Sequence, residues 1–274
     1  MGKQSTWTGE RLETGIFNET TIEHLHRYAL ALELAEGKKV LDIACGEGYG
    51  SNLLAQKAKQ VTGVDIDIDT IGRARNKYTA ANLSFQQGST IRIPAADRQF
   101  DMVVSFETLE HVEEQEQMIS EIKRVLAPAG LLLISTPDKK NYSDATGYRN
   151  PFHIKELYAD EFKRLLHQQF RHVQLLYQQM NFSSVITTEQ ETPVKLFTGD
   201  FQAVRRDSAA NALYLLAIAS DEELLPLPNS IFNGRSVFEQ AVLDREKMVT
   251  GTITYRLGHA LLYPFKLVKK ILKR

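Results

Sequence analysis

The sequence contains a single cysteine, Cys45, among its 274 residues. One cysteine excludes an intrachain disulfide and a zinc site built from cysteines, and it fits a reducing compartment. No apolar run reaches the length of about 18 residues that a membrane-spanning helix needs. The first residues, MGKQSTWTGERLE, also lack the apolar core of a signal peptide. These absences predict a cytoplasmic protein.

An excess of charge of one sign is missing as well. Lysine and arginine number 33 and aspartate and glutamate 34, so the formal net charge is −1. Nucleic-acid-binding domains are usually basic, and we therefore expect no nucleic-acid partner. Hydrophobic residues at 43% and charged residues at 24% are typical of a globular chain with a substantial core.

Short apolar runs alternate with helical patterns along most of the chain. The runs predict strands at 38–44, 61–67, 83–88, 100–106, 130–136, 170–178 and 212–220, and the helical patterns lie at 19–35, 51–58, 69–80, 113–126 and 157–168. Strands that are apolar throughout are typical of a parallel sheet covered on both faces. Alternation of strands with helices therefore predicts a doubly wound α/β fold.

Two of these helices carry start or stop signals. In the first, Asn18 is a candidate N-cap and Gly37 a candidate terminator. Its expected apolar face consists of Ile22, Leu25, Ala29 and Leu32, which recur at steps of three and four residues. Pro128 and Gly130 are expected to end the helix at 113–126, before the strand at 130–136.

The pattern divides the chain into three parts. Residues 1–37 form an N-terminal helix or lid, 38–220 the α/β domain with an insertion at 180–210, and 221–274 a C-terminal extension. Residues 251–274 hold six basic residues and no acid, interleaved with leucines and other apolar residues. That composition resembles a basic amphipathic helix that lies on an anionic membrane surface, which is one of two interpretations and would place the protein at the inner face of a membrane. The alternative is a helix that packs on the domain or on another subunit, and a homodimer also stays open.

A glycine-rich turn follows the first predicted strand, in VLDIACGEGYGS at 40–51. Gly46, Gly48 and Gly50 leave room for a ligand against the backbone, at the strand end where α/β sheets bind ligands. A dinucleotide-binding turn would read GxGxxG, whereas these glycines read GxGxG. Asp42 would repel a phosphate and attract a cationic sulfonium or ammonium group. The turn therefore favours a cationic nucleoside over a dinucleotide.

A second acid, Asp65, ends the second predicted strand and lies 19 residues beyond Gly46. A carboxylate in this place of a nucleotide-binding fold accepts hydrogen bonds from ribose hydroxyls. The alternative is an ordinary solvated aspartate at a strand end.

The segments VLDIACGEGYG, GVDID, FDMVVSFETLEH and RVLAPAGLLLISTP follow one another across residues 38–137. Together they resemble the successive motifs of class I S-adenosylmethionine (SAM)-dependent methyltransferases. The resemblance implies a mostly parallel, seven-stranded Rossmann-like sheet with a reversed final strand. It also implies SAM as cofactor and S-adenosylhomocysteine as product. The cofactor-binding residues that it implies are Asp42, Ala44, Gly46 and Gly48 near the methionine moiety, Asp65 at the ribose, Ile66, Gly88, Ser89 and Thr90 at the adenine, and Phe106 and Glu107 near the sulfur.

A narrower resemblance rests on TGERLE, EHLHRYALA, ETLEHV and NPFHIKEL. These segments are similar to bacterial methyltransferases that act on sugars of surface polysaccharides, and the tail is similar to tails of glycan-assembly enzymes. The resemblance implies that the acceptor is a sugar hydroxyl in bacterial surface glycan biosynthesis. The expected substrate-binding residues are Arg11, His24, His26 and Tyr28.

Methyl transfer to a hydroxyl is an in-line displacement that benefits from a general base. Glu110, His111 and His153 follow the fourth and fifth predicted strands, and histidine has a suitable pKa. His111 could instead only pack on a helix, His153 could start a helix, and Glu110 could be a first-turn acid. Asp138 and Asp144 are conceivable ligands of a divalent metal. No metal site is expected, because the sequence shows no tight cluster of ligands around them.

Three other functions remain open at this point. The first is methyl transfer to a quinone-type or other small lipophilic acceptor. The second is a nicotinamide-dependent oxidoreductase on the same fold, which the GxGxG spacing and Asp42 disfavour. The third is a non-catalytic scaffold that binds SAM.

Overall fold

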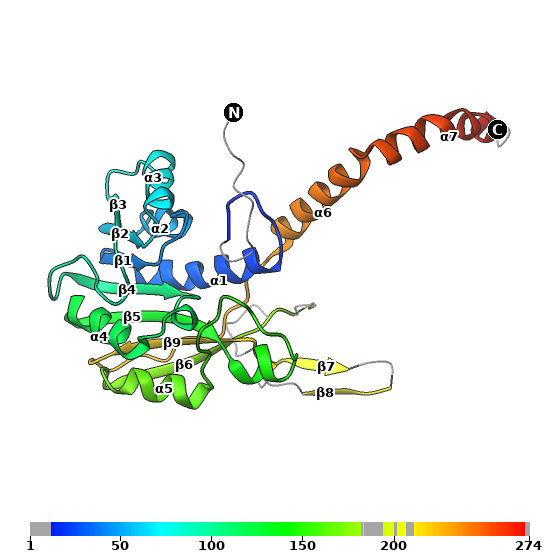
Figure 1. Ribbon diagram of the computed structural model, residues 1–274. Helices are drawn as coiled ribbons and strands as arrows, with labels where there is room; N and C mark the ends of the chain where they lie inside the picture. The colour runs from blue at the N-terminus through cyan, green and yellow to red at the C-terminus, as the bar shows by residue number, and fades with distance from the viewer. Residues whose placement is uncertain (1–11, 182, 184–193, 200–201, 207–210, 272–274) are drawn as a thin grey trace.

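A computed structural model describes residues 12–181, 183, 194–199, 202–206 and 211–271. Its centre is a seven-stranded sheet of order β3-β2-β1-β4-β5-β9-β6 (Figure 1). The strands are β1 (Lys39–Ile43), β2 (Gln60–Asp65), β3 (Leu83–Gln87), β4 (Phe100–Phe106), β5 (Leu126–Pro137), β6 (His172–Gln178) and β9 (Tyr214–Ser220). Strand β9 lies antiparallel between β5 and β6, and the other strands share one direction. The predicted sheet with a reversed final strand is confirmed.

Helices cover both faces of this sheet (Figure 1). They are α1 (Glu19–Leu34), α2 (Tyr49–Leu54), α3 (Ile68–Lys77), α4 (Gln115–Val125) and α5 (Ala159–His167). In β1, Leu41 and Ile43 join the hydrophobic cluster that contains α4 and α5, whereas Val40 joins the one that contains α1 and α2. Successive strand residues point to opposite faces, which explains why the strands are apolar at nearly every position.

Helix α1 begins as expected but buries an unexpected face. The Asn18 Oδ1 accepts a hydrogen bond from the Thr21 amide at 3.0 Å, which completes a capping box. The expected apolar face, Ile22, Leu25, Ala29 and Leu32, is only half-buried. The buried residues of α1 are Glu23, Arg27, Tyr28 and Ala31. Apolar periodicity missed this face because it contains an acid and a base.

The boundary between α4 and β5 differs from the prediction. Helix α4 ends at Val125 and β5 starts directly at Leu126, so Pro128 and Gly130 lie inside the strand. The pairing with β4 is irregular between Phe100 and Met102, where β5 advances from Leu126 to Leu131. A strand irregularity tolerates proline, because its missing N–H falls where no regular ladder bond is needed.

The insertion and the C-terminal extension each add structure. Within 180–210, β7 (Phe197–Gly199) pairs antiparallel with β8 (Val204–Arg206). Beyond Pro226, α6 (Arg235–Thr250) and α7 (Ile253–Ile271) extend away from the sheet (Figure 1). Helix α7 confirms a helix in the basic tail, while α6 was not predicted. Among the described helices, none is long and apolar enough to cross a membrane.

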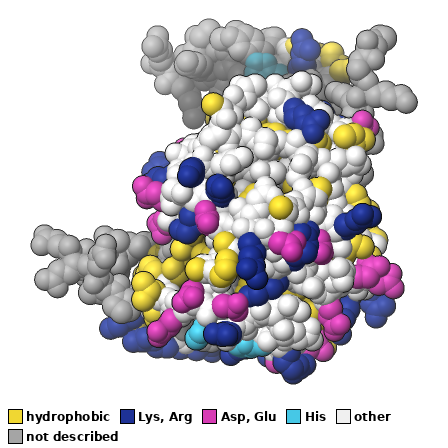
Figure 2. Space-filling view, turned by 90° about the vertical axis from the view of Figure 1, so that its left-hand side faces the viewer, with side chains coloured by type: hydrophobic (Ala, Val, Ile, Leu, Met, Phe, Trp, Pro, Cys, Tyr) yellow, Lys and Arg dark blue, Asp and Glu magenta, His cyan; other side chains and the backbone are white. Residues whose placement is uncertain are grey.

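The face at the left of Figure 1 lies opposite the arrowhead of β4. Figure 2 shows acidic and basic side chains interspersed over the described atoms of this face. Mixed charges of this kind are typical of an ordinary solvated surface. A ligand site is therefore expected at the opposite edge, where the parallel strands end.

Candidate active site

The strand order changes direction between β1 and β4, the place where open α/β sheets bind ligands. Each of these strands is followed by a non-glycine residue in the left-handed region, Ala44 with φ +61° and Glu107 with φ +50°. Such conformations cost on the order of 1–3 kcal/mol and cluster at functional sites. The two positions flank the switch point and mark it as the candidate active site.

The three glycines of the turn after β1 are favoured over larger residues for different structural reasons. A Cβ on Gly46 would meet no heavy atom within 4 Å, so this position leaves room for a ligand. A Cβ on Gly48 would lie 2.6 Å from Phe85, and one on Gly50 would lie 1.8 Å from Tyr28. Gly48 and Gly50 therefore also make room for side chains of the protein, and a ligand contact at these two glycines stays a prediction.

Asp65 ties the end of β2 to this turn. Its Oδ2 accepts a hydrogen bond from the Gly46 amide at 2.9 Å, and its Oδ1 accepts one from the Asp67 amide at 3.0 Å. The next residue, Ile66, is 66% exposed beside the turn, an unusual exposure for isoleucine. These positions are compatible with a ribose at Asp65 and an adenine on Ile66, and both roles stay predictions.

The predicted adenine edge, Gly88 to Thr90, follows β3. Gly88 has a packing reason to be glycine, because a Cβ there would lie 2.4 Å from Pro94. The Ser89 hydroxyl accepts a hydrogen bond from the Ile91 amide at 3.3 Å. Thr90 is half-buried. The segment thus forms a short hydrogen-bonded turn at the edge of the site.

Asp42 lies beneath the turn and is 2% exposed. Its carboxylate accepts hydrogen bonds from the Tyr28 hydroxyl at 3.3 Å and the Ser51 hydroxyl at 2.6 Å. Burial raises the pKa of Asp42 to about 7. These two described partners are neutral hydroxyls, so a bound cation would compensate the buried charge. This arrangement suits the sulfonium or ammonium group of a cationic nucleoside.

Helix α1 holds three of the four predicted substrate-binding residues, and Arg11 lies outside the described residues. Tyr28 packs edge-on against Phe106, with ring centroids 5.0 Å apart. The His24 Nδ1 lies 2.8 Å from the Tyr49 hydroxyl, and burial lowers the pKa of His24 to about 3. The His26 Nε2 lies 2.8 Å from the Ser230 hydroxyl. Tyr28 therefore supports the cofactor turn, and the substrate contacts of all four residues stay predictions.

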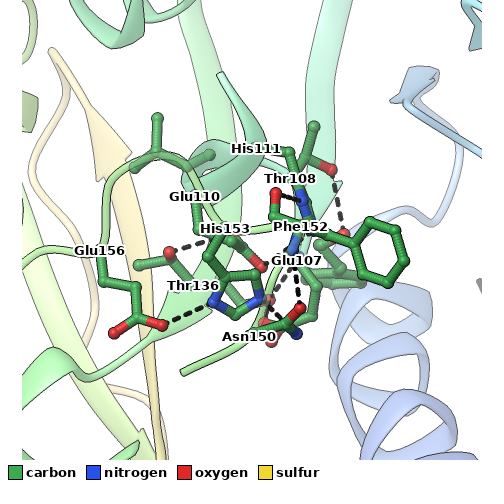
Figure 3. Close-up of polar contacts among 12 residues, drawn as sticks. Glu107, Thr108, Glu110, His111, Thr136, Asn150, Phe152, His153 and Glu156 are labelled. Atoms are coloured by element: carbon green, nitrogen blue, oxygen red, sulfur yellow. Dashed lines mark hydrogen bonds and ion pairs between the residues drawn. The ribbon is translucent and has the colours of Figure 1, made fainter. Parts of the chain in front are cut away.

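The three predicted catalytic residues come together beyond β4 and β5 (Figure 3). The His111 Nε2 lies 3.8 Å from the Glu110 Oε1, and the rings of His111 and His153 meet edge to face with centroids 5.0 Å apart. The Glu110 carbonyl accepts hydrogen bonds from the amides of Ile154 and Lys155, which holds the segment with His153 against the end of β4. We call these side chains the Glu110–His111–His153 cluster.

Glu110 is the most deeply buried member of this cluster, at 1% exposure. Its Oε2 accepts a hydrogen bond from the Thr136 hydroxyl at 3.0 Å. Burial, reinforced by the nearby Glu107 carboxylate, holds the pKa of Glu110 well above its usual range. Perturbed carboxylates of this kind gather at functional sites, which supports the predicted catalytic place of Glu110.

Sequence reasoning missed Arg27 at this site. The Arg27 side chain is 1% exposed, and its NH1 lies 3.3 Å from the Glu107 Oε1. Its guanidinium lies 4.5 Å above the Tyr214 ring, a cation–π contact. Glu23 lies one helical turn earlier in α1, and burial raises the pKa of Glu23 to about 7. The only signal in the sequence was the four-residue spacing of Glu23 and Arg27, which is equally common on exposed helices.

Asp138 and Asp144, the metal ligands considered from the sequence, form hydrogen bonds with residues outside this cluster. Asp138 accepts from the Asn141 side chain at 3.0 Å, and Asp144 accepts from the Tyr158 hydroxyl at 2.7 Å. The potential ligand group that the described residues do form consists of Glu110, His111 and His153. One ligand atom from each lies within 4.8 Å of the others.

Comparisons with known proteins agree with this geometry. Residues 41–134 match the family model of a methyltransferase domain. A probable S-adenosylmethionine-dependent methyltransferase of Mycolicibacterium smegmatis is 37% identical over 162 residues, which is 58% of this chain and 62% of that protein. A ubiquinone biosynthesis O-methyltransferase of Coxiella burnetii is 38% identical over 103 residues, which is 37% of this chain and 44% of that protein.

A solved structure shares the fold. In the complex between the Haloferax volcanii Trm112 methyltransferase activator and a methyltransferase, the matching chain is 21% identical with a TM-score of 0.57. The match covers 76% of this chain and 94% of that chain. The chain spans about three fifths of the length of the mycobacterial relative. The comparisons show that residues 41–134 are similar to methyltransferase domains, that curated relatives of the chain are named S-adenosylmethionine-dependent methyltransferases, and that the fold is shared with a solved methyltransferase.

Proposed function

We propose that this protein is a SAM-dependent O-methyltransferase. SAM would lie across the switch point on the turn at Gly46, and the acceptor hydroxyl would face the Glu110–His111–His153 cluster. One observation carries the proposal: neighbouring strands β1 and β4 end in the cofactor turn and in the cluster, respectively. A methyl donor on one strand end and a proton-accepting group on the next are what transfer to a hydroxyl requires.

The reaction is a displacement at the methyl carbon. The acceptor oxygen forms a bond to that carbon while the carbon–sulfur bond breaks, and the electron pair stays on sulfur in S-adenosylhomocysteine. The hydroxyl proton leaves toward the cluster. Asp42 and Asp65 bind and orient the cofactor, and Arg27 holds the Glu107 carboxylate beside the reacting groups. Alignment of the reactants supplies much of the acceleration, because it converts a bimolecular step into an effectively unimolecular one.

For the acceptor we propose a sugar hydroxyl of a bacterial surface glycan. Polar and aromatic groups surround the cluster, which suits a ring that carries many hydroxyls. The Tyr142 ring stacks on His153 with centroids 5.4 Å apart, and Asn150 donates to the His153 Nε2 at 3.0 Å. Tyr142 also contacts Tyr214, whose ring Arg27 covers. This lining offers several hydrogen-bonding groups near one reacting position.

A quinone-type or other lipophilic acceptor is the second candidate. It is favoured by the exposed apolar side chains of α7, among them Leu257, Leu261 and Leu262, and by the name of the Coxiella relative. Residues 251–274 would then dock the protein on an anionic membrane, where such acceptors reside. Co-sedimentation with vesicles rich in anionic lipid tests this placement, since deletion of 251–274 should abolish it.

Methyl transfer from isotope-labelled SAM tests the proposed function. Nucleotide sugars and oligosaccharides would be offered in parallel with catechols and quinols in vesicles. Label in a glycan fraction supports the sugar proposal, and label only in the lipid fraction replaces it with the second candidate. SAM binding without transfer to any of these acceptors contradicts both and favours a scaffold.

A further inference from the structure

The Glu110–His111–His153 cluster has the geometry of a metal centre, and we propose that it binds one divalent transition-metal ion. Its three ligand atoms, one from each residue, lie within 4.8 Å of one another. Nitrogen and oxygen ligands bind such ions at about 2.0–2.2 Å, so three of them at tetrahedral or octahedral angles around one ion lie about 2.8–3.6 Å apart. The His111 Nε2 and the Glu110 Oε1, at 3.8 Å, are already close to this spacing, and rotation of the side chains would bring the three ligand atoms into range. The side chains converge from the end of β4 and from the segment after β5 (Figure 3).

The hydrogen bonds of His111 leave the correct nitrogen available. The His111 Nδ1 lies 2.9 Å from the Phe152 carbonyl oxygen. A carbonyl only accepts, so Nδ1 carries the proton and Nε2 carries the lone pair. That Nε2 is the atom nearest Glu110, 3.8 Å from its Oε1. Metal-bound histidines typically donate their other N–H to a carbonyl or carboxylate in this way.

His153 is oriented in the same way as His111, by a hydrogen bond from its Nδ1. Its Nδ1 lies 2.6 Å from the Glu156 Oε1, so the carboxylate accepts from Nδ1 and leaves the lone pair on Nε2. The Asn150 Nδ2 donates to that Nε2 at 3.0 Å, and its orientation is fixed because the Asn150 Oδ1 accepts from the Phe152 amide. An ion at Nε2 would replace the Asn150 hydrogen bond.

The third ligand is a buried carboxylate on the side of the cluster next to Thr136. Burying ionised carboxylates is costly unless a cation or strong hydrogen bonds compensate. The Thr136 hydroxyl occupies one oxygen of Glu110, and the other oxygen faces His111. A divalent ion between these groups would supply the missing positive charge. Two imidazoles and one carboxylate favour Mn²⁺, Fe²⁺, Co²⁺ or Zn²⁺ over Mg²⁺ and Ca²⁺, which prefer oxygen ligands.

The role of the ion rests on the proposed O-methyltransferase function. A bound divalent ion lowers the pKa of an oxygen ligand and fixes its position. The acceptor hydroxyl would bind to the ion, lose its proton to water and attack the methyl carbon of SAM as the oxygen–carbon bond forms. In this arrangement Glu110, His111 and His153 hold the ion, and water replaces the cluster as the acceptor of the hydroxyl proton in the proposed reaction.

Metal binding can be tested without SAM or an acceptor. The full chain, free of any affinity tag and treated with a chelator, would be titrated with Mn²⁺ and followed by loss of the free-ion EPR signal. A parallel Co²⁺ titration would report the ligand set by its visible spectrum. We expect one equivalent to bind, and His111→Gln, His153→Gln and Glu110→Gln each to weaken binding at least about tenfold. Glu156→Gln should also weaken it by about 10–100-fold, because it removes the carboxylate behind His153.

His167→Gln, on α5, is the matched control and should leave the affinity unchanged. Circular dichroism melts would confirm that each variant folds. If a ligand variant does not fold, Glu156→Gln still tests the site, because it leaves all three ligands in place. Absence of stoichiometric Mn²⁺ and Co²⁺ binding, or binding that the variants leave unchanged, overturns the inference. If the protein binds SAM but no metal, the metal site is contradicted and the proposed function stands. If it binds metal but no SAM, the proposed function is contradicted and the metal site stands.

Discussion

The two halves of the candidate site are built in opposite ways. The cofactor half, Asp42, the turn at 44–48 and Asp65, comes from two consecutive strands and the short segments after them. The acceptor half brings together Arg27 of α1, the segment 107–111 after β4 and residues 150–156 after β5. Local sequence therefore determines the first half, while the second depends on the whole fold. Substitutions in the acceptor half should therefore lower the rate of methyl transfer, and substitutions in the cofactor half should lower the affinity for SAM.

The largest expected effect lies in the acceptor half. Glu110→Gln removes the carboxyl group of the cluster, which can exchange a proton, keeps the size of the side chain and should lower the rate of methyl transfer by about 10²–10⁴-fold. The dissociation constant of SAM should change less than about twofold, because no residue of the cofactor half is touched. Kinetics and calorimetry on the same preparation measure both quantities. Glu113→Gln, an exposed neighbour, is the control. A parallel loss of SAM binding would mean that the two halves are not separable.

The next largest effect lies in the cofactor half. Asp65→Ala removes the acceptor of the Gly46 amide and the expected ribose contact. A loss of about 2–3 kcal/mol corresponds to a SAM affinity weaker by about 30–150-fold. Asp69→Ala, in the first turn of α3, should have little effect in the same calorimetric titration. An unchanged dissociation constant for Asp65→Ala would remove Asp65 from the cofactor site.

The pH dependence of SAM binding should depend on the cofactor half alone. Since burial raises the pKa of Asp42 to about 7, the carboxylate of the free protein is mostly neutral below pH 7. A cation favours its ionised form, so the affinity for SAM should fall by up to about tenfold for each unit of pH below 7 and level off above it. Titrations between pH 5.5 and 7.5 measure this slope.

The control is Asp42→Asn, for which the slope should vanish, because Glu23, whose pKa burial also raises to about 7, lies on α1 and not in the cofactor half. In the absence of SAM the sign for stability is opposite. Folding raises the pKa of Asp42 from 3.8, so the folded state binds the proton more tightly and its stability decreases as the pH rises from about 4 to 7. A slope that persists in the Asn variant would assign the titration to another group.

The smallest effect concerns the support of the cofactor turn. Gly50→Ala places a Cβ 1.8 Å from the Tyr28 ring, and overpacking of this kind costs about 1–3 kcal/mol of unfolding free energy. Thermal melting should show a lower Tm. Gly72→Ala, in α3 with open space around it, should leave the Tm unchanged or raise it slightly. An equal Tm for the two variants would contradict the packing reason for Gly50.

The sheet was predictable because its strands are apolar at successive positions and alternate with helices. The turn at Gly46 and the acid at Asp65 were predictable because strand, turn and acid follow one another in the chain. The reasons for Gly48 and Gly50 were not, since Phe85 and Tyr28 approach them from distant segments. Glu110, His111 and His153 were identified one by one, but their convergence depends on the bonds between the Glu110 carbonyl and the amides of 154–155.

Other features depended on tertiary structure in the same way. Arg27 was missed because burial of an arginine requires partners such as Glu107, directly after β4, and Tyr214, in β9, which are both distant from α1 in sequence. Pro128 was misplaced because a strand irregularity absorbs its missing donor, and turn statistics assign proline to the connection instead. In each case local preference was overridden by contacts between residues far apart in sequence.

The switch point between β1 and β4 is expected to bind SAM, and calorimetric titration of the full chain with SAM and with S-adenosylhomocysteine measures this binding. We expect one site for each ligand, with micromolar dissociation constants. Absence of binding of both ligands at millimolar concentration, in protein shown to be folded by its melting transition, would contradict this expectation.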